Sequence, residues 1–195
     1  LAYINGTKYF YTKPILVLEI AIKGILNVIE ACIKNKVKEL YLASSSEVYQ
    51  TPNKIPTDEH ESLKIPNIFN PRYSYGGGKI LTELMGVHYG KKYFKKMVIF
   101  RPHNVYGPNM GYEHVIPEFI NRFRKMKKKS KKFIIKGNGN ETRSFIFIDD
   151  FISSFDLILK KGKHLDIYNI GTTERIKIHN LAIKISKFFK KKIIL

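Results

Sequence analysis

Cysteine is almost absent from this sequence: Cys32 is the only one among 195 residues. A single thiol excludes an internal disulfide framework and fits a reducing compartment, so we expect a cytoplasmic protein. The neighbours of Cys32 are Ala31 and Ile33, and neither could act as a base toward the thiol. We therefore interpret Cys32 as a buried helix residue rather than as a nucleophile.

Long apolar runs are also missing, since no stretch approaches the ~20 residues that a membrane-spanning helix requires. The first residues, LAYINGTKYFY, lack a basic leader and an apolar core, so no export signal is predicted. The initiator methionine is absent too, and we expect the natural N-terminus to lie upstream. With 44% hydrophobic residues, 12 Tyr and 13 Phe but no Trp, the composition indicates a globular protein with no membrane partner.

Acidic residues are scarce: 16 Asp and Glu stand against 35 Lys and Arg, which gives a formal net charge of +19. Most of the positive charge is lysine spread over nearly every expected helix and turn, whereas phosphate and base recognition favours arginine. In the densest run, Arg122–Lys132, no aromatic residues alternate with the lysines as a stacking platform would require. We interpret this run as a solvated face. A nucleic-acid-binding protein is the alternative, and it predicts steeply salt-dependent binding.

Apolar periodicity alternates between helix and strand along the chain. The first half predicts a helix at Ile15–Lys34, a strand at Glu39–Ser46, a helix at Ser74–Tyr93 and a strand at Met97–Gly107. The polar, proline-punctuated loop at Gln50–Pro71 is too long for an ordinary connection, which suggests a functional segment. Alternating helices and strands imply right-handed crossovers, so the expected fold class is α/β with a doubly wound parallel sheet.

Beyond Pro108 the pattern loosens. The expected elements are a helix at Ile116–Lys127, a strand at Phe133–Lys136, a tight turn at Gly137–Asn140, a strand at Ser144–Ile148, a helix at Asp150–Lys160, a strand at Asp166–Ile170 and a helix at Ile178–Phe189. We expect two domains, residues 1–107 and residues 108–195, with residues 144–170 returning to the main sheet.

Polar residues follow two of the expected strands. Ser44-Ser45-Ser46-Glu47 ends one strand, and Arg101-Pro102-His103-Asn104 ends the next. In open parallel sheets the ligand binds at the carboxyl ends of the strands. The sequence therefore predicts a binding site that both segments share.

Tyr75 and Lys79 lie four residues apart at the start of a predicted helix, so their side chains share one face. A free phenol has a pKa near ~10, and one pKa unit corresponds to about 1.4 kcal/mol. A tyrosine that acts as a base near neutral pH needs roughly 4 kcal/mol of phenolate stabilisation, and an ammonium one turn away supplies part of it.

Three consecutive glycines, Gly76–Gly78, separate the two residues. In a helix each glycine costs up to about 1 kcal/mol relative to alanine. They fit a place where a Cβ would collide with a cofactor ring or a partner helix. The alternative is that the glycines form a loop and the helix begins only at Lys79.

Five blocks occur in order: ASSSEVY, the Tyr75 and Lys79 pair, RPHNVYGP, GNGNETRSFIFIDD and YNIG. In this order and approximate spacing the chain resembles extended short-chain dehydrogenase/reductases that act on nucleotide sugars. These enzymes include sugar 4-epimerases, 4,6-dehydratases and UDP-glucuronate decarboxylases. The resemblance covers nearly the whole chain and implies a Rossmann-like sheet with a small, incomplete C-terminal substrate-binding subdomain. It also implies NAD as cofactor, a nucleotide-diphosphate sugar as substrate, and a homodimer paired through the helices at Ile15–Lys34 and Ser74–Tyr93.

The resemblance implies a role for each matching residue. Tyr75 corresponds to the catalytic base, and Lys79 to the lysine that lowers the tyrosine pKa and holds the nicotinamide ribose. Ser45 corresponds to the residue that hydrogen-bonds the sugar 4-hydroxyl, and Glu47 is a further catalytic candidate. The remaining candidates are Ser44, Pro102 and His103 for the cofactor and Ser46, Asn104 and Arg143 for the substrate. No metal ligand is implied.

Three of these residues have simpler alternative interpretations. Arg143 could be the partner of a surface ion pair, although an arginine fork also suits the substrate diphosphate. Asn104, which corresponds to a second diphosphate ligand, could be a turn former. His103 could be a strand-end residue with no role in binding.

Both ends of the sequence depart from this family. The family opens with a strand, a glycine-rich turn and a helix that bind the NAD pyrophosphate, but no Gly-x-x-Gly-x-x-Gly occurs here. The missing N-terminal βα units would amount to at least roughly 60 residues. The chain also stops before the family's last substrate-domain elements. We therefore expect a piece truncated at both ends that by itself binds NAD poorly or not at all.

The second departure concerns the reaction. Family members share a first step, in which the tyrosinate takes the sugar 4-hydroxyl proton while hydride leaves C4 for NAD and a 4-keto sugar forms. Dehydratases generally carry Asp-Glu where this chain has Ser46-Glu47, and decarboxylases often show Ser-Glu. We favour a 4-epimerase or 4,6-dehydratase, with a UDP-glucuronate decarboxylase-like enzyme next and a non-catalytic remnant as a third alternative.

Overall fold

The computed structural model of the chain describes residues 3–4, 6–127 and 131–194. The chain divides into two compact units. Unit 1 consists of Leu1–His103 and Asp149–Ile170, and unit 2 consists of Asn104–Ile148 and Gly171–Leu195. None of the helices in the described residues is long and apolar enough to cross a membrane.

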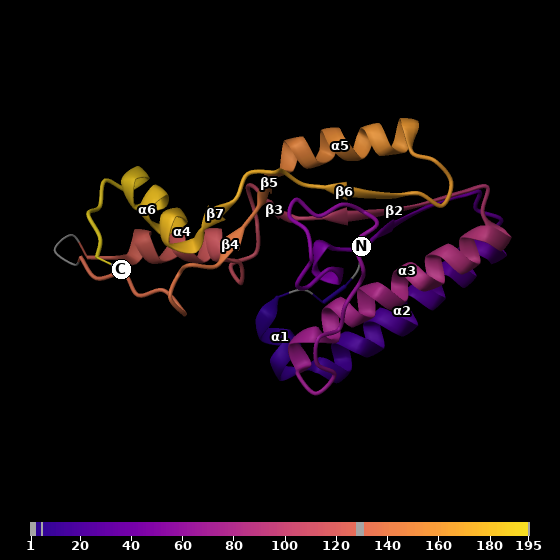
Figure 1. The fold of residues 1–195 in the computed structure, drawn as a ribbon, viewed down its shortest axis with the longest axis horizontal. Helices are drawn as coiled ribbons and strands as arrows, with labels where there is room; N and C mark the ends of the chain where they lie inside the picture. The colour runs from indigo at the N-terminus through magenta and orange to yellow at the C-terminus, as the bar shows by residue number, and fades with distance from the viewer. Residues whose placement is uncertain (1–2, 5, 128–130, 195) are drawn as a thin grey trace. The chain divides into compact units, whose positions relative to one another are not determined.

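The described part of unit 1 contains a three-stranded parallel sheet with the strand order β1-β2-β6. Its strands are β1 (Glu39–Ala43), β2 (Lys96–Pro102) and β6 (Ile167–Ile170). Its helical elements are α1 (Thr7–Thr12), α2 (Pro14–Lys34), η1 (Ser46–Val48), η2 (Pro71–Tyr73), α3 (Ser74–Tyr93) and α5 (Ile148–Lys161). Helices α2 and α3 lie side by side on one face of the sheet and α5 covers the other face (Figure 1). The expected α/β fold with a parallel sheet is confirmed.

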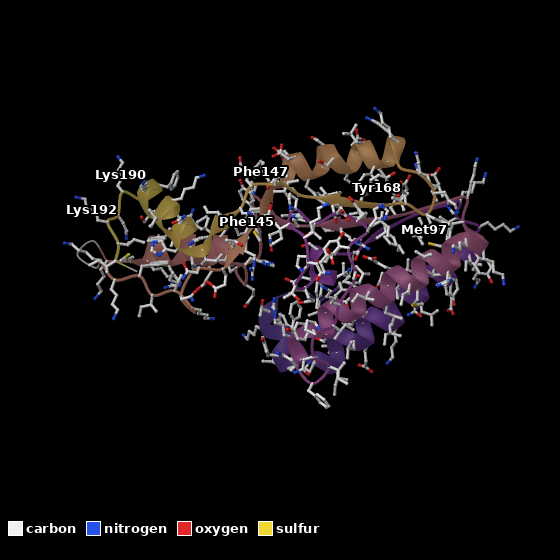
Figure 2. All side chains as sticks on the ribbon, viewed as in Figure 1. Met97, Phe145, Phe147, Tyr168, Lys190 and Lys192 are labelled. Carbon is white, nitrogen blue, oxygen red and sulfur yellow. The ribbon has the colours of Figure 1, made fainter. Side chains whose placement is uncertain are left out.

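Apolar side chains fill the space between the sheet and the helix pair. Met97 of β2 lies between the sheet and α3 (Figure 2), where it faces Gly86 and Gly90 of that helix. Burying a side chain of this size stabilises the fold by about 1.5–3 kcal/mol. The buried residues of this cluster are Ile29, Leu40, Leu42, Phe94, Met97 and Ile99. On the opposite face of the sheet, Phe100 packs against the phenylalanine rings of α5.

Helix α3 begins at Ser74, so the three glycines belong to its first turns and the alternative start at Lys79 is wrong. A Cβ on Gly76 would lie 3.0 Å from the carbonyl oxygen of Glu47. A Cβ on Gly78 would lie 2.7 Å from the Cβ of Ala21 in α2, and nearer still to the Tyr3 hydroxyl. The glycines therefore allow α2 and η1 to approach α3 closely, as the partner-helix interpretation expected.

A substitution pair tests this packing. Gly78→Ala should lower the free energy of unfolding by about 1–3 kcal/mol because the new methyl group overlaps Ala21. The matched control is Gly24→Ala in α2, where no described atom lies within 4 Å of the new Cβ. The control should be neutral or stabilise the chain by up to about 1 kcal/mol. Urea unfolding followed by circular dichroism measures both, and equal effects would contradict the close approach.

Unit 2 has two short sheets and two helices in its described residues. Strand β3 (Asn104–Tyr106) pairs in parallel with β5 (Phe145–Phe147), and β4 (Thr142–Arg143) pairs antiparallel with β7 (Ile176–Lys177). The helices are α4 (Val115–Lys125) and α6 (Ile178–Phe188). The buried core of this unit consists of Phe119, Phe123, Phe133, Leu181 and Ala182.

Three expected strands differ from the structure. The strand expected at Glu39–Ser46 ends at Ala43, and Ser46 begins η1. The strand expected at Met97–Gly107 is interrupted at His103, because β2 pairs within unit 1 and β3 pairs with β5 in unit 2. The strand expected at Phe133–Lys136 does not form. Instead, Phe133 packs into the core of unit 2, where its ring stacks on Phe123 of α4 with ring centroids 4.1 Å apart. The substrate-binding role of unit 2 stays a prediction.

Candidate active site

Tyr75 and Lys79 project from the same side of α3 toward the carboxyl end of β1. The Lys79 ammonium donates a hydrogen bond of 2.7 Å to the carbonyl oxygen of Ala43, the last residue of β1. The same ammonium lies 5.8 Å from the centre of the Tyr75 ring. The structure thus brings the two residues of the predicted pair together at the end of the strand where the serines follow.

Aromatic residues from the N-terminal segment enclose the pair. Phe10 of α1 stacks on Tyr75 with ring centroids 4.9 Å apart, and Tyr3 meets the same ring edge-on at 5.0 Å. Tyr3 also lies under Lys79, with the ammonium 4.3 Å from its ring centre, a cation–π contact. Both members of the pair are buried, Tyr75 at 9% exposed and Lys79 at 6%.

The three strand-end serines have different environments. Ser45 caps η1 by accepting a hydrogen bond from the Glu47 backbone, and its hydroxyl also hydrogen-bonds the Tyr75 side chain. Ser44 points elsewhere and donates to the carboxylate of Glu83 in α3. Ser46 begins η1 and is half-buried. Ser45 is therefore the serine in direct contact with the candidate base.

Burial dominates the electrostatics of the pair. Burial raises the pKa of Tyr75 above its usual value, the Ser45 hydrogen bond opposes this, and the negative charge of Glu47 adds to it. Burial also lowers the pKa of Lys79 from 10.5 to about 8, while the carboxylate of Glu83 acts in the opposite direction. In the described residues the surroundings of Tyr75 therefore favour the protonated phenol, and Lys79 alone does not make it a base.

The pair has hydrogen-bonding capacity left for a ligand. An ammonium group has three N–H donors, and the hydrogen bond from Lys79 to Ala43 uses one of them. Two buried hydroxyls nearby, those of Tyr3 and Ser74, have no hydrogen-bond partner among the described residues. These free donors and acceptors fit a polyhydroxyl group such as the ribose of a dinucleotide. A cationic ring near Tyr75 would also supply the phenolate stabilisation that the protein lacks.

Glu47 lies at the edge of the site and is more exposed. Its carboxylate is 3.5 Å from the Arg72 guanidinium, and both side chains are partly exposed to solvent. An ion pair of this kind contributes little to stability. Glu47 is thus free to exchange Arg72 for another partner, as a second acid or base would need.

The candidates at the end of β2 divide between the units. Pro102 ends β2, and the backbone N–H of His103 donates to the carbonyl of Ile170 at 2.8 Å. Burial lowers the pKa of His103, which favours the neutral imidazole. Asn104 and Arg143 belong to unit 2. Their proposed contacts with substrate stay predictions.

Within unit 2 the two diphosphate candidates have different surroundings. The Asn104 amide donates to the carbonyl of Ser144 at 2.9 Å and so connects β3 to the residue after Arg143. The exposed Arg143 guanidinium donates to the carbonyl of Thr142. In the described part of the chain it forms no ion pair with a carboxylate, so the surface ion-pair alternative has no support.

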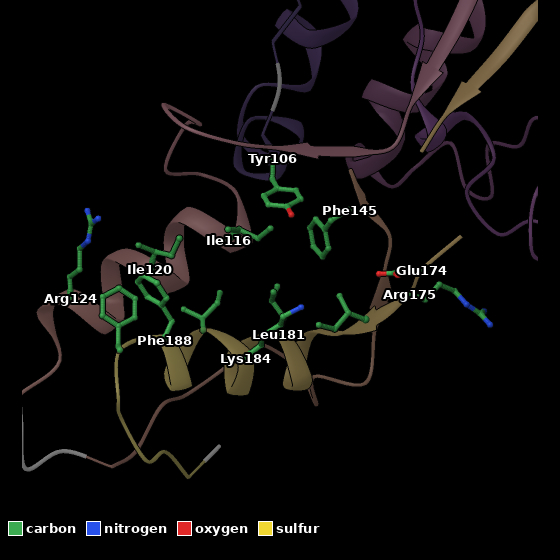
Figure 3. Close-up of a pocket in the computed structure, with 13 residues that line it drawn as sticks. Tyr106, Ile116, Ile120, Arg124, Phe145, Glu174, Arg175, Leu181, Lys184 and Phe188 are labelled. Atoms are coloured by element: carbon green, nitrogen blue, oxygen red, sulfur yellow. The ribbon is translucent and has the colours of Figure 1, made fainter. Parts of the chain in front are cut away.

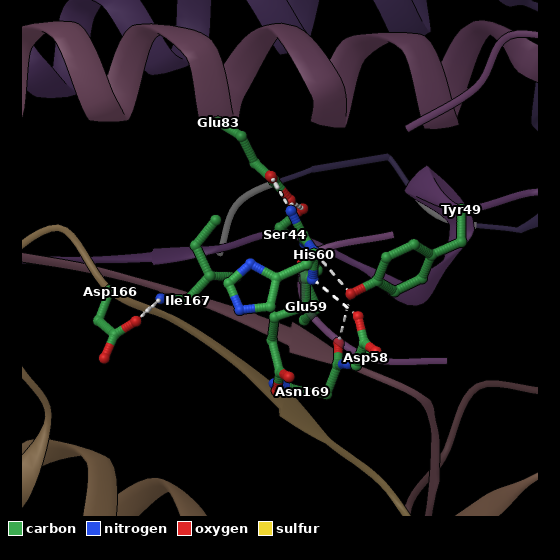
Figure 4. A network of polar contacts seen from close by, with 10 residues as sticks. Ser44, Tyr49, Asp58, Glu59, His60, Glu83, Asp166, Ile167 and Asn169 are labelled. Carbon is green, nitrogen blue, oxygen red and sulfur yellow. Dashed lines mark hydrogen bonds and ion pairs between the residues drawn. The ribbon is translucent and has the colours of Figure 1, made fainter. Parts of the chain in front are cut away.

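Sequence reasoning placed Arg101 in the strand-end segment but missed that it is buried and that Glu83 is its partner. Arg101 of β2 and Glu83 of α3 form a buried ion pair at 2.6 Å and are 2% and 4% exposed. Figure 4 shows the surrounding network, which reaches Ser44, Tyr49 and further residues. The signal was present in the apolar run MVIFRP, since a charged residue in a buried strand requires a partner.

Unit 2 also contains an apolar cavity of about 700 Å³. It lies between α4 and α6, with Tyr106 and Phe145 at one end and Phe188 at the other (Figure 3). None of the predicted site residues lines it. The cavity therefore does not coincide with the site built around Tyr75.

The basic run Arg122–Lys132 extends past the end of α4, and residues 128–130 lie outside the described residues. Arg122 is engaged within unit 2. Its guanidinium pairs with Glu118 at 3.2 Å and stacks over the Phe133 ring at 4.1 Å. Arg122 therefore contributes to the packing of unit 2. This favours a structural role over nucleic-acid binding for this part of the run.

Comparison with known proteins adds three findings. Residues 1–171 match the family model described as the NAD dependent epimerase/dehydratase family. A dTDP-D-glucose 4,6-dehydratase of Dictyostelium discoideum is 33% identical over 180 residues, which cover 90% of this chain and 41% of that protein. The chain thus spans about two fifths of the length of this relative.

Solved structures agree with this match. A UDP-N-acetylglucosamine 4-epimerase from Methanobrevibacter ruminantium, solved in complex with UDP-N-acetylmuramic acid, superposes with a TM-score of 0.82 at 26% identity. The match covers 99% of this chain and 60% of that one. A dTDP-glucose 4,6-dehydratase from Streptomyces venezuelae with NAD bound gives a TM-score of 0.87 at 19% identity, over 98% and 56% of the two chains, and supports the fold.

Proposed function

Because the chain belongs to the NAD-dependent epimerase/dehydratase family, we propose that the complete protein is a nucleotide-sugar 4-epimerase or 4,6-dehydratase that works through a 4-keto sugar. NAD is the cofactor of this family. The observation that supports the proposal most strongly is the assembly of Ser45, Tyr75 and Lys79 at the carboxyl end of β1. This edge of a parallel sheet is where such folds bind ligands.

In the proposed mechanism Ser45 and Tyr75 act on the sugar 4-hydroxyl. Ser45 already hydrogen-bonds Tyr75, so a hydroxyl bound between them would contact both. The Tyr75 oxygen accepts the hydroxyl proton, and Lys79 holds the cofactor ribose with its remaining N–H donors. NAD, when bound, supplies the hydride acceptor and a positive charge close to Tyr75. Phe10 and Tyr3 exclude water from the aromatic side of Tyr75.

The position of Glu47 bears on the later steps. Its carboxylate is next to Ser46 at the site edge and only loosely paired with Arg72. We propose that it serves as the second base, which a dehydratase of this family would use to remove the C5 proton after C4 is oxidised, whereas a 4-epimerase would not require it. The named relatives include a 4,6-dehydratase and a 4-epimerase, which favours these two reactions over the decarboxylase alternative.

A substrate panel tests the proposed function. The complete protein is incubated with NAD and UDP-, dTDP-, GDP- and CDP-sugars, and 4-keto products are sought by mass spectrometry after trapping with hydroxylamine. The proposal expects one sugar nucleotide to give a 4-keto species or its epimerised or dehydrated successor. No turnover of any member of the panel, with NAD shown to bind, would contradict it.

We also propose that two copies pair through α2 and α3. Three apolar residues spaced three and four apart on α2 are exposed: Ile15 at 75%, Leu18 at 39% and Ile22 at 44%. Leu84 of the neighbouring α3 is exposed as well. Exposed apolar residues on two neighbouring helices are typical of an interface.

Ile22→Glu should therefore convert a dimer into a monomer, because a buried, unpaired carboxylate at the interface is strongly unfavourable. Light scattering coupled to size exclusion gives the mass directly. The matched control is Ile152→Glu on α5, which is also an exposed apolar helix residue but lies on the opposite face of the sheet. If Ile22→Glu remained a dimer, with twice the mass of a single chain, this surface would be excluded as the interface.

A further inference from the structure

The buried ion pair of Glu83 and Arg101 has no role in the mechanism above, yet it lies directly behind the candidate site. Both carboxylate oxygens of Glu83 accept from the guanidinium, at 2.8 Å and 2.6 Å. A bidentate pair of this geometry is specific in orientation as well as strong. Removing one partner of such a pair leaves an uncompensated buried charge.

Arg101 is held from its other side by the loop that follows η1. Its Nη1 donates to the Tyr49 hydroxyl at 2.6 Å and to the Glu59 carbonyl at 3.0 Å. Tyr49 in turn donates to Asn169 of β6 at 2.9 Å, and the Asn169 backbone donates to the Glu59 carboxylate at 2.7 Å (Figure 4). The guanidinium is therefore fixed between the strand ends, the helix and the loop.

Glu83 connects this network to the site in two ways. It accepts the hydroxyl hydrogen bond of Ser44, the residue that follows Ala43. It also lies one helical turn after Lys79 on α3, and its negative charge acts on the ammonium. Lys79, held at Ala43, thus has the carboxylate on one side and the ring of Tyr3 on another.

We propose that Glu83 and Arg101 are positioning residues for Lys79: Glu83 attracts the ammonium, and Arg101 limits that attraction by binding the same carboxylate. The catalytic meaning of this inference rests on the proposed function of Lys79. The electrostatic relation itself is a property of the chain alone.

Other groups around Lys79 do not replace this pair. Tyr3 and Tyr75 face the ammonium as neutral phenols, since burial raises the pKa of both. Glu47, on η1, acts on Tyr75 rather than on Lys79 and is paired with Arg72. Among the described residues, Glu83 is the carboxylate whose charge acts on Lys79.

The inference predicts opposite effects for the two partners. In Glu83→Gln the attraction is lost and Arg101 remains, so the titration midpoint of Lys79 should fall by about one pH unit. In Arg101→Gln the carboxylate is no longer neutralised, so the midpoint should rise by about one pH unit. In the double variant both charges are gone, and the midpoint should return to within a few tenths of the wild-type value.

NMR of the chain with ¹³C-labelled lysine measures these midpoints without cofactor or substrate. The Lys79 ¹³Cε resonance is assigned by its loss in Lys79→Arg. Glu19→Gln is the matched control, because Glu19 is likewise four residues from a lysine on a helix, with which it pairs on the exposed surface of α2. It should leave the Lys79 midpoint unchanged. Circular dichroism confirms that each variant is folded, and the double variant remains informative if a single variant does not fold.

The result separates positioning from a purely structural role. Equal shifts in the same direction would overturn the inference, because loosened packing alone would let water reach Lys79 in both variants. The absence of any shift in folded variants would overturn it as well. Opposite shifts would support it. Because the readout needs no turnover, a failed sugar-nucleotide panel together with opposite shifts would reject the proposed function while leaving the electrostatic relation intact.

Discussion

Tyr75→Phe should lower the turnover of the complete protein about 10²- to 10⁴-fold while KM for the sugar nucleotide changes little. The variant keeps the ring that packs between Phe10 and Tyr3 and removes the oxygen that we propose accepts the 4-hydroxyl proton. General-base catalysis by a positioned side chain contributes a factor of this size. Steady-state formation of the 4-keto product measures both constants on the substrate that the panel identifies.

The control for this prediction is Tyr93→Phe, at the exposed end of the same helix. It loses an identical hydroxyl group far from the strand-end serines and should retain wild-type turnover. If Tyr75→Phe also retained full turnover, another group would be the base, and the assignment of the site would have to be abandoned. A loss confined to KM would instead indicate a role in binding.

Lys79→Met should abolish activity and at the same time stabilise the fold by about 1–3 kcal/mol at pH 7. Burial lowers the pKa of Lys79 to about 8, against 10.5 when it is exposed, so the folded chain carries a charged group in an unfavourable environment at neutral pH. A difference of this size corresponds to about 3 kcal/mol, and the lost hydrogen bond to Ala43 offsets part of it. Functional residues often reduce stability in this way.

The lowered pKa of Lys79 determines how its contribution to stability changes with pH. Between about pH 8 and pH 10.5 the unfolded chain binds the Lys79 proton and the folded chain does not, so wild-type stability gains from this group as the pH rises. The advantage of the methionine variant should therefore be largest below pH 8 and should shrink toward pH 10. Urea unfolding at pH 7 and pH 9.5 measures the stability of both proteins. The control is Lys91→Met at an exposed position, and its free energy of unfolding should stay within about 0.5 kcal/mol of the wild-type value. A variant destabilised equally at both pH values would contradict the burial argument.

Much of unit 1 could be predicted from the sequence because its elements are long and strongly periodic. Helix α3 has the predicted bounds, Ser74–Tyr93, and its first turn already indicated that Tyr75 and Lys79 share a face. The serines follow β1 as the predicted site requires, although the strand ends at Ala43, three residues before its predicted end at Ser46. The family resemblance was confirmed by the match over residues 1–171.

The misses have physical causes. Phe133–Lys136 has the composition of a strand, but Phe133 and Ile135 pack into the core beside α4 without forming a ladder. Helix α1 has six residues and no side-chain cap, so no local signal marks it. The run MVIFRP indicates that Arg101 needs a partner, but the identity of that partner, Glu83, depends on how close α3 lies to β2, which the glycines on that helix allow.

The roles of the adjacent Ser44, Ser45 and Ser46 differ although the side chains are chemically identical. One bonds the buried carboxylate of Glu83, the next bonds Tyr75, and the third starts a turn. What distinguishes them is the direction in which each leaves the backbone as the extended strand gives way to η1. Spacing along this stretch therefore matters more than composition: losing a single peptide unit here would present the wrong serine to the phenol without changing which kinds of residue are present.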